Sequence, residues 1–155
     1  MAATAINHVN LPVDDLEEAV AFYEGVLGLE QIPAINSSAR GAWFGLGDAQ
    51  LHLTERGSSA PKIHHLAVTV DDFPALYDEL VDRDALDDTF GATLYEFPDG
   101  AVQVYFRDPS GNLLEADWPD ASTLPDRIRN RVETRAEVLD APQTGEARAA
   151  TLFPD

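Results

Sequence analysis

Apolar and polar positions alternate over residues 5–13, and this period of two predicts a strand. The polar face holds His8 and Asn10, and the apolar face holds Val9, Leu11 and Val13. Apolar residues then recur at helical spacing over residues 16–27, which predicts an amphipathic helix. Asp14 or Asp15 is placed to cap this helix, and Gly28 is placed to end it. Three short strands are predicted next, at residues 29–35, 42–46 and 49–55.

The same order of elements returns in the second half of the chain. A strand is predicted at residues 63–70, and a helix follows whose apolar face holds Phe73, Leu76, Tyr77 and Leu80. Three more strands are predicted near residues 93–97, 101–107 and 112–117. Each half therefore has the order β-α-β-β-β. Three successive strands joined by tight turns favour an α+β fold with mainly antiparallel pairing.

The two halves also share residues. Residues 6–15 align with residues 63–72 without a gap, so that His8 falls on His65. We interpret this as one unit built twice, with repeat one at about residues 5–56 and repeat two at about residues 62–118 of a single domain, 1–120. Residues 121–155 have no counterpart and predict a helical C-terminal extension, with a charged helix from Ser122 or Thr123 to about Leu139. This extension is either a solvated appendage or an arm that docks on its own domain or on a twin subunit.

Composition narrows the classes of function. The chain has 28 acidic and 10 basic residues, a net charge of −18 and no cysteine. Such a surface repels nucleic acids and anionic membranes, and no apolar run is long enough to span a bilayer. The N-terminus lacks the pattern of a signal peptide. We therefore expect a cytoplasmic protein, and the acidic surplus favours a halophile with a salt-rich cytoplasm over an acidic mesophile protein.

Histidine and glutamate occupy equivalent places in the repeats. His8 and His65 share one position, and alternation turns His64 to the opposite face. His52 in the last strand of repeat one corresponds to Glu115 in the last strand of repeat two. Three imidazoles and a carboxylate suit one divalent ion of Fe, Mn, Ni, Co or Zn with positions open to substrate. A structural role for each residue taken singly is the alternative.

Other residues share faces with these candidates. Asn10 lies on the face of His8, Gln50 and Thr54 on the face of His52, and Thr69 on the face of His65. Gln103, Tyr105 and Arg107 alternate on one face of the penultimate strand, either the inner or the outer one. Trp43 is either a pocket wall or a core residue. The candidates for substrate binding are Asn10, Trp43, Thr69, Tyr105 and Arg107.

Four stretches of the chain resemble the vicinal oxygen chelate superfamily, which includes glyoxalase I, extradiol dioxygenases, fosfomycin-resistance thiol transferases and bleomycin-binding proteins. They are INHVNLPVDDLEEAVAFYEGVLGLE, GAWFGLGDAQLHL, HHLAVTVDD and QVYFRDPSGNLLEAD. The resemblance implies two βαβββ units that curl into a half-open barrel around one divalent metal, and a homodimer. It makes His8, His65 and Glu115 ligands, and His52 a fourth ligand or a catalytic base.

The leading hypothesis is a glyoxalase-type lyase or isomerase that chelates vicinal oxygens of a small carbonyl compound or its thiol adduct, with Glu115 or His52 moving the proton. Alternatives are an Fe(II) extradiol dioxygenase and a metal-free protein that binds a drug. A thiol transferase acting on an epoxide antibiotic is a further alternative. It would need a cationic pocket, for which Arg40, Arg56 and Arg107 are available.

Overall fold

The structure of the protein is a computed structural model that describes residues 3–35, 39–57, 63–134, 144–145 and 151–153. The chain forms two compact units. Unit 1 comprises Met1–Pro61 and Asp108–Asn112, and unit 2 comprises Lys62–Arg107 and Leu113–Asp155. In the parts of the chain described, no helix is long and apolar enough to cross a membrane. The sequence also predicts loops at residues 36–40 and 56–61, of which residues 36–38 and 58–61 lie outside these parts.

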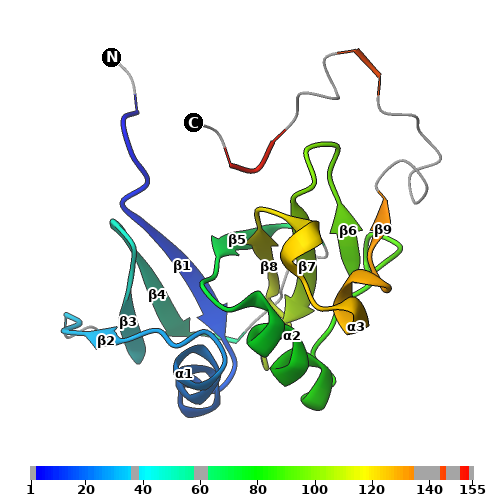
Figure 1. Ribbon diagram of the computed structural model, residues 1–155. Coiled ribbons are helices and arrows are strands. Elements are labelled where there is room, and N and C mark those ends of the chain that lie inside the picture. The colour runs from blue at the N-terminus through cyan, green and yellow to red at the C-terminus, as the bar shows by residue number, and fades with distance from the viewer. Residues whose placement is uncertain (1–2, 36–38, 58–62, 135–143, 146–150, 154–155) are drawn as a thin grey trace. The chain divides into compact units, whose positions relative to one another are not determined.

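Unit 1 has one four-stranded sheet with the order β1-β4-β3-β2 (Figure 1). The strands are β1 (His8–Val13), β2 (Gln31–Ile32), β3 (Gly41–Leu46) and β4 (Ala49–Glu55). β4 pairs with β3 in an antiparallel hairpin and with β1 in parallel. The sheet is therefore mixed, whereas the sequence pattern favoured mainly antiparallel pairing. The turn between β3 and β4 contains Gly47 at φ +56°, a conformation that glycine adopts without steric cost.

Helix α1 (Leu16–Gly25) covers one face of this sheet. Asp15 begins the helix, because its side chain accepts a hydrogen bond from the Glu18 amide at 2.9 Å. The apolar face of the helix packs onto the apolar positions of the strands. This core consists of Val13, Leu16, Ala19, Phe22, Tyr23, Ala42, Phe44, Leu51 and Leu53. The opposite face of the sheet remains free to carry the polar residues of the alternating pattern.

Unit 2 repeats this plan with a five-stranded sheet of order β5-β8-β7-β6-β9. The strands are β5 (His65–Thr69), β6 (Leu94–Glu96), β7 (Val102–Arg107), β8 (Leu113–Trp118) and β9 (Glu133–Thr134). β5 pairs with β8 in parallel, as β1 pairs with β4 in unit 1. Helix α2 (Phe73–Asp82) begins at Asp72, whose side chain accepts from the Ala75 amide. Its buried face consists of Phe73, Leu76, Tyr77 and Leu80.

The C-terminal extension differs from the single helix predicted for it. A 3-10 turn η1 (Ala121–Thr123), a four-residue helix α3 (Asp126–Arg129) and strand β9 follow one another. Ile128 and Leu124 are buried, and β9 adds in parallel to the edge of β6. The prediction of a continuous charged helix is therefore wrong up to residue 134, because burial and strand pairing interrupt it. Its continuation to Leu139 lies beyond the described residues.

The turn between β7 and β8 belongs to unit 1, although both strands belong to unit 2. One carboxylate organises this turn: Asp108 accepts from the Ser110 and Asn112 amides at 3.0 and 2.8 Å and from the Asn112 side chain at 2.8 Å. Its Oδ2 also accepts from the buried Tyr23 hydroxyl of α1 at 2.9 Å. Burial and the charge of Asp108 raise the pKa of Tyr23, so the hydroxyl keeps its proton and donates. Asn112 donates in turn to the Pro12 carbonyl at 2.9 Å.

Candidate functional site

Unit 1 brings two of the predicted ligands into contact. His8 on β1 and His52 on β4 stack with ring centroids 4.4 Å apart and planes 13° apart. Trp43 on β3 stacks on His52 at 4.0 Å and 2°. The three strands lie side by side, and His52 pairs in register with Asn10 and Trp43, so alternation delivers these side chains to the face opposite α1. The stack therefore follows from strand order and register.

Hydrogen bonds assign the hydrogens on these two rings. His8 Nδ1 lies 2.8 Å from Asn7 Oδ1, and His52 Nε2 lies 2.9 Å from Gln50 Oε1. An amide oxygen only accepts, so each of these nitrogens carries the hydrogen in the neutral ring. His8 Nε2 and His52 Nδ1 keep their lone pairs. Burial and the neighbouring His8 lower the pKa of His52, which favours its neutral, lone-pair form.

Unit 2 brings the other two predicted ligands together. His65 Nε2 on β5 lies 3.2 Å from Glu115 Oε2 on β8. His65 Nδ1 lies 3.0 Å from the Ile63 carbonyl, which only accepts, so Nδ1 carries the ring hydrogen. Glu115 is buried, and its Oε2 accepts from Gln103 Nε2 at 3.3 Å. Tyr105 packs edge-on against His65.

The contact between His65 and Glu115 is unfavourable when the imidazole ring is neutral and the carboxyl group is ionised. With the hydrogen on Nδ1, a lone pair on Nε2 faces a carboxylate oxygen, and two acceptors at 3.2 Å repel each other unless a proton or a cation lies between them. Metal-binding histidines characteristically donate the other ring N–H to a carbonyl or amide oxygen, as His8 and His65 both do. The donor set of imidazole nitrogens and one carboxylate oxygen therefore fits a divalent metal.

Asp117 is a further polar residue on this face that the sequence patterns did not single out. It is two residues beyond Glu115 on β8, pairs in register with Thr69 and Gln103, and is buried. Its Oδ1 has no hydrogen-bond partner in the described structure. The alternation in Glu115-Ala116-Asp117 could have predicted this position, because it puts both carboxylates on one face of the strand.

The remaining predicted site residues occupy different environments. Asn10 accepts from the Thr54 hydroxyl at 2.8 Å, and Tyr105 is buried beside Glu115 in register. Arg107 donates from Nε to Asp87 Oδ2 at 2.7 Å and from Nη2 to Thr89 at 3.0 Å. Thr69 is exposed on β5.

Each unit holds one pair of the four predicted ligands. Within the ranges described, no group of three or more His, Asp or Glu side chains is placed to hold a metal ion.

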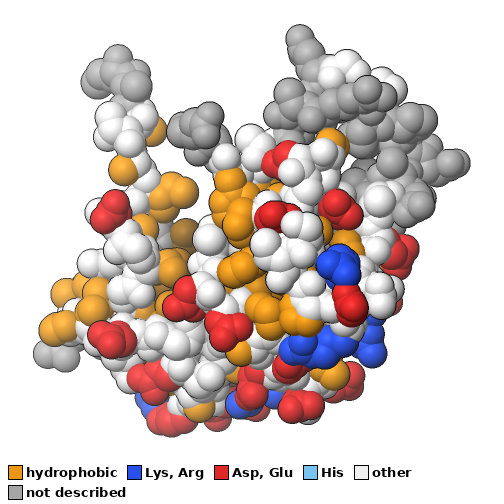
Figure 2. Space-filling view, in the orientation of Figure 1, with side chains coloured by type: hydrophobic (Ala, Val, Ile, Leu, Met, Phe, Trp, Pro, Cys, Tyr) orange, Lys and Arg blue, Asp and Glu red, His pale blue; other side chains and the backbone are white. Residues whose placement is uncertain are grey.

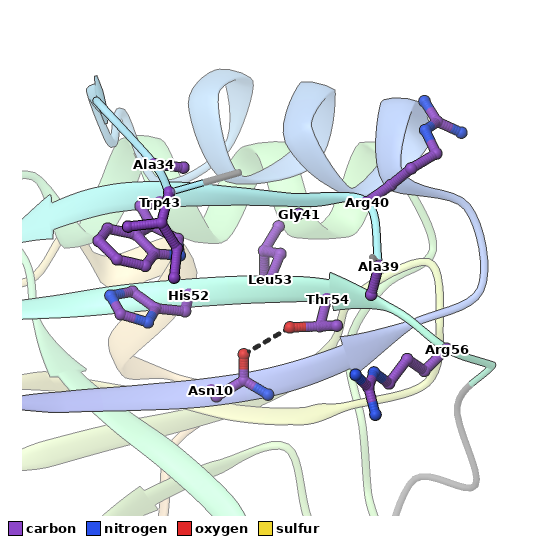
Figure 3. Close-up of a pocket in the computed structure, with 11 residues that line it drawn as sticks. Asn10, Ala34, Ala39, Arg40, Gly41, Trp43, His52, Leu53, Thr54 and Arg56 are labelled. Carbon is purple, nitrogen blue, oxygen red and sulfur yellow. Dashed lines mark hydrogen bonds between the residues drawn. The ribbon is translucent and has the colours of Figure 1, made fainter. Parts of the chain in front are cut away.

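A cavity of about 330 Å³ opens beside His52 in unit 1 (Figure 3). Trp43 forms part of its wall. Asn10 and Thr54 project into it from β1 and β4. Arg40 and Arg56 also line it. The cavity thus combines an aromatic wall, a hydroxyl–amide pair and arginines next to a candidate ligand.

Comparison with known proteins identifies the class. Residues 5–116 match the family model of the Glyoxalase/Bleomycin resistance protein/Dioxygenase superfamily. The chain belongs to this superfamily, as its resemblance to vicinal oxygen chelate proteins implied.

Particular relatives place the chain within the superfamily. It is 30% identical over 141 residues to the metallothiol transferase FosB of Lysinibacillus sphaericus, covering 83% of this chain and 89% of that protein. The lactoylglutathione lyase structure from Agrobacterium tumefaciens is 25% identical with a TM-score of 0.56, covering 76% of this chain and 95% of the other. The fosfomycin resistance protein FosX from Listeria monocytogenes shares the fold, with 17% identity, a TM-score of 0.61 and coverage of 75% and 93%.

Proposed function

We propose that the protein is a divalent-metal-dependent enzyme, a glyoxalase-type lyase or isomerase that acts on a small carbonyl compound or its thiol adduct. The ligands in this proposal are His8, His65 and Glu115, with His52 as a fourth ligand or as the base. The observation that carries it is the His65–Glu115 pair, which places an imidazole nitrogen 3.2 Å from a buried carboxylate oxygen, a donor pair that suits a shared divalent cation. Membership of the superfamily and relatives named for metallothiol transfer and lactoylglutathione cleavage support the same class.

A divalent cation in this site would polarise two neighbouring substrate oxygens and stabilise negative charge that develops on them. Side chains of the protein supply the proton acceptor and hold it and the carboxylate in position. His52 has a lowered pKa and an unprotonated Nδ1, so it is suited to accept a proton from substrate at neutral pH. Gln103 holds Glu115 Oε2, and the stacked Trp43 fixes the orientation of the His52 ring.

Thiol transfer is the second candidate function, favoured by the relative named metallothiol transferase at 30% identity. In such a reaction a thiol sulfur attacks an epoxide carbon, a C–S bond forms and the C–O bond breaks. The thiol proton would pass to His52, and the alkoxide would take up a proton. Both candidates use the same ligands and base, and they differ in the electrophile.

Metal binding is the decisive test. We expect Mn, Ni, Zn or Fe(II) to raise the thermal midpoint of the metal-free protein, with about 2.7 kcal/mol of stabilisation when free metal is 100-fold above Kd. Glu115→Gln and His65→Ala should each weaken metal affinity by more than the roughly 10- to 100-fold that loss of a residue supporting a ligand typically costs. Glu30→Gln, which alters an exposed carboxylate, is the matched control and should bind as wild type does.

A wild-type protein that shows no shift with any of these metals would contradict the proposal and favour a metal-free binding protein. The two reactions are then separated by substrate. Consumption of methylglyoxal in the presence of a thiol marks the lyase, and addition of a thiol to an epoxide such as fosfomycin marks the transferase. Glu115→Gln should abolish whichever activity is found while leaving the unfolding curve of the metal-free protein nearly unchanged.

A further inference from the structure

The two arginines that line the cavity beside His52 differ in their partners. Arg40 Nη1 lies 3.1 Å from both carboxylate oxygens of Glu55, and its Nη2 contacts Glu17. Its side chain points away from the cavity (Figure 3). Two carboxylates thus neutralise Arg40, and it has no charge to offer a ligand.

Arg56 has no such partner. Other arginines in the described ranges bind carboxylates or a tyrosine hydroxyl; they are Arg40, Arg83, Arg107, Arg127, Arg129 and Arg131. No ion pair or hydrogen bond of the Arg56 guanidinium occurs within those ranges. In a chain with 28 acidic and 10 basic residues, a guanidinium left without a carboxylate beside a cavity is unexpected. A ligand would supply the missing anion.

The backbone fixes where Arg56 stands. The amides of Arg56 and Gly57 both donate to the Val13 carbonyl at 3.2 Å, which ties the end of β4 to β1. Residues 52, 54 and 56 alternate onto one face, so Arg56 continues the row of His52 and Thr54. Its side chain extends toward Asn10 and Thr54 (Figure 3). At about 3.3 Å per residue, the backbone positions of His52 and Arg56 lie roughly 13 Å apart.

We propose that this cavity binds the anionic end of a small organic substrate, a carboxylate or phosphonate, through Arg56. The inference deepens the proposed function and rests on it, because His52 then lies at the reacting end. A guanidinium forms two parallel hydrogen bonds to such groups. The Asn10 side-chain N–H donates to the same end, because the Thr54 hydroxyl already donates to Asn10 Oδ1 and holds that amide in place. The Trp43 ring packs against the middle of the molecule. The roughly 13 Å spacing favours a substrate longer than a three-carbon ketoaldehyde, such as a thiol adduct that bears a carboxylate.

Binding of methylphosphonate to the metal-free protein tests the subsite directly. Trp118→Phe leaves Trp43 as the single tryptophan, so its emission reports on the cavity. At constant ionic strength we expect methylphosphonate to change this emission in a saturable way, and its neutral dimethyl ester to leave it unchanged. Arg56→Gln should weaken binding about tenfold or more, and Arg56→Lys by less, because charge remains without the bidentate geometry.

Arg83→Gln is the matched control, since that guanidinium binds Glu79 on α2 in unit 2, and it should titrate as the parent does. Equal binding by the Arg56→Gln protein, binding of the neutral ester, or no response of the parent protein would each overturn the subsite. His65→Ala separates the two proposals. It should lose metal affinity and keep methylphosphonate binding. Retained metal binding would refute the metal site and leave the anion subsite standing.

Discussion

Asp117 is a buried carboxyl group two residues after Glu115 on β8. Burial, the charge of Glu115 and a hydrogen bond with Glu115 together raise its pKa to about 8. The unfolded chain releases this proton near pH 4. Between those values the folded state binds a proton that the unfolded state does not, so stability falls as pH rises from about 4 to 8.

Asp117→Asn should remove this loss. The amide stays neutral at every pH, so the variant should match wild type near pH 4 and exceed it near pH 8 in the metal-free protein. We expect a gain of about 1 kcal/mol, equivalent to roughly 2–4 °C in Tm. Thermal unfolding of both proteins across this pH range measures it, with the exposed Asp88→Asn as control. Curves that run parallel at all pH values would contradict the assignment.

At the level of single residues, strand alternation was sufficient to place side chains on faces but not to set their hydrogen bonds. It put Asn10 on the face of His8, and it put His65 on the face opposite His64. Which ring nitrogen is free depends on neighbours such as Asn7, Gln50 and Ile63, whose rotamers and backbone positions a period-two pattern does not encode. The ion pairs of Arg40, and the lack of one at Arg56 among the described residues, were hidden for the same reason.

At the level of elements, helices and hairpins were predictable from capping residues, glycine turns and periodicity. Asp15, one of the two predicted capping residues, begins α1, and Gly28 takes the predicted left-handed conformation at φ +63°. The parallel pairing of β1 with β4 and of β5 with β8 was not predicted. Alternation fixes which face a side chain occupies, but it is identical for parallel and antiparallel neighbours. Strand direction follows from the chain path.

The helix predicted beyond residue 121 shows how tertiary contacts override local propensity. Ile128→Ala tests whether this extension is part of the folded unit. Ile128 is fully buried, so its truncation should cost about 2–5 kcal/mol in the free energy of unfolding, measured in urea. Val81→Ala, at a residue 43% exposed on α2, is the matched control and should cost less than about 0.5 kcal/mol. A small cost for both would indicate an extension that contributes nothing to stability.

At the level of the whole molecule, acidic side chains are spread over the face shown in Figure 2, and basic ones are few and grouped. A net charge of −18 makes the folded chain repel itself, and salt screens this repulsion. The Debye length falls from about 30 Å at 0.01 M salt to about 3 Å at 1 M. The halophile hypothesis rests on this balance between self-repulsion and screening by salt.

Thermal unfolding in KCl tests that hypothesis. Between low salt and molar KCl we expect Tm to rise by roughly 5–10 °C, which corresponds to about 2–3 kcal/mol for a domain of this size. Differential scanning calorimetry in the presence of a chelator measures the effect of salt without that of bound metal. A midpoint that does not rise would place the protein among ordinary acidic proteins.

The turn at residues 108–112 lies in the second repeat but belongs to unit 1, so the chain cannot be divided cleanly at the repeat boundary. The Tyr23 hydroxyl donates to Asp108, and the Pro12 carbonyl accepts from Asn112. Both partners come from the second repeat. A polypeptide that stopped after the first repeat would bury a phenol with no acceptor and would lack five residues of its own unit. Two fragments divided at the repeat boundary should therefore be soluble only when they are co-expressed. A circular permutant with its new termini at another place would keep Tyr23 and the turn that carries its acceptor in one chain.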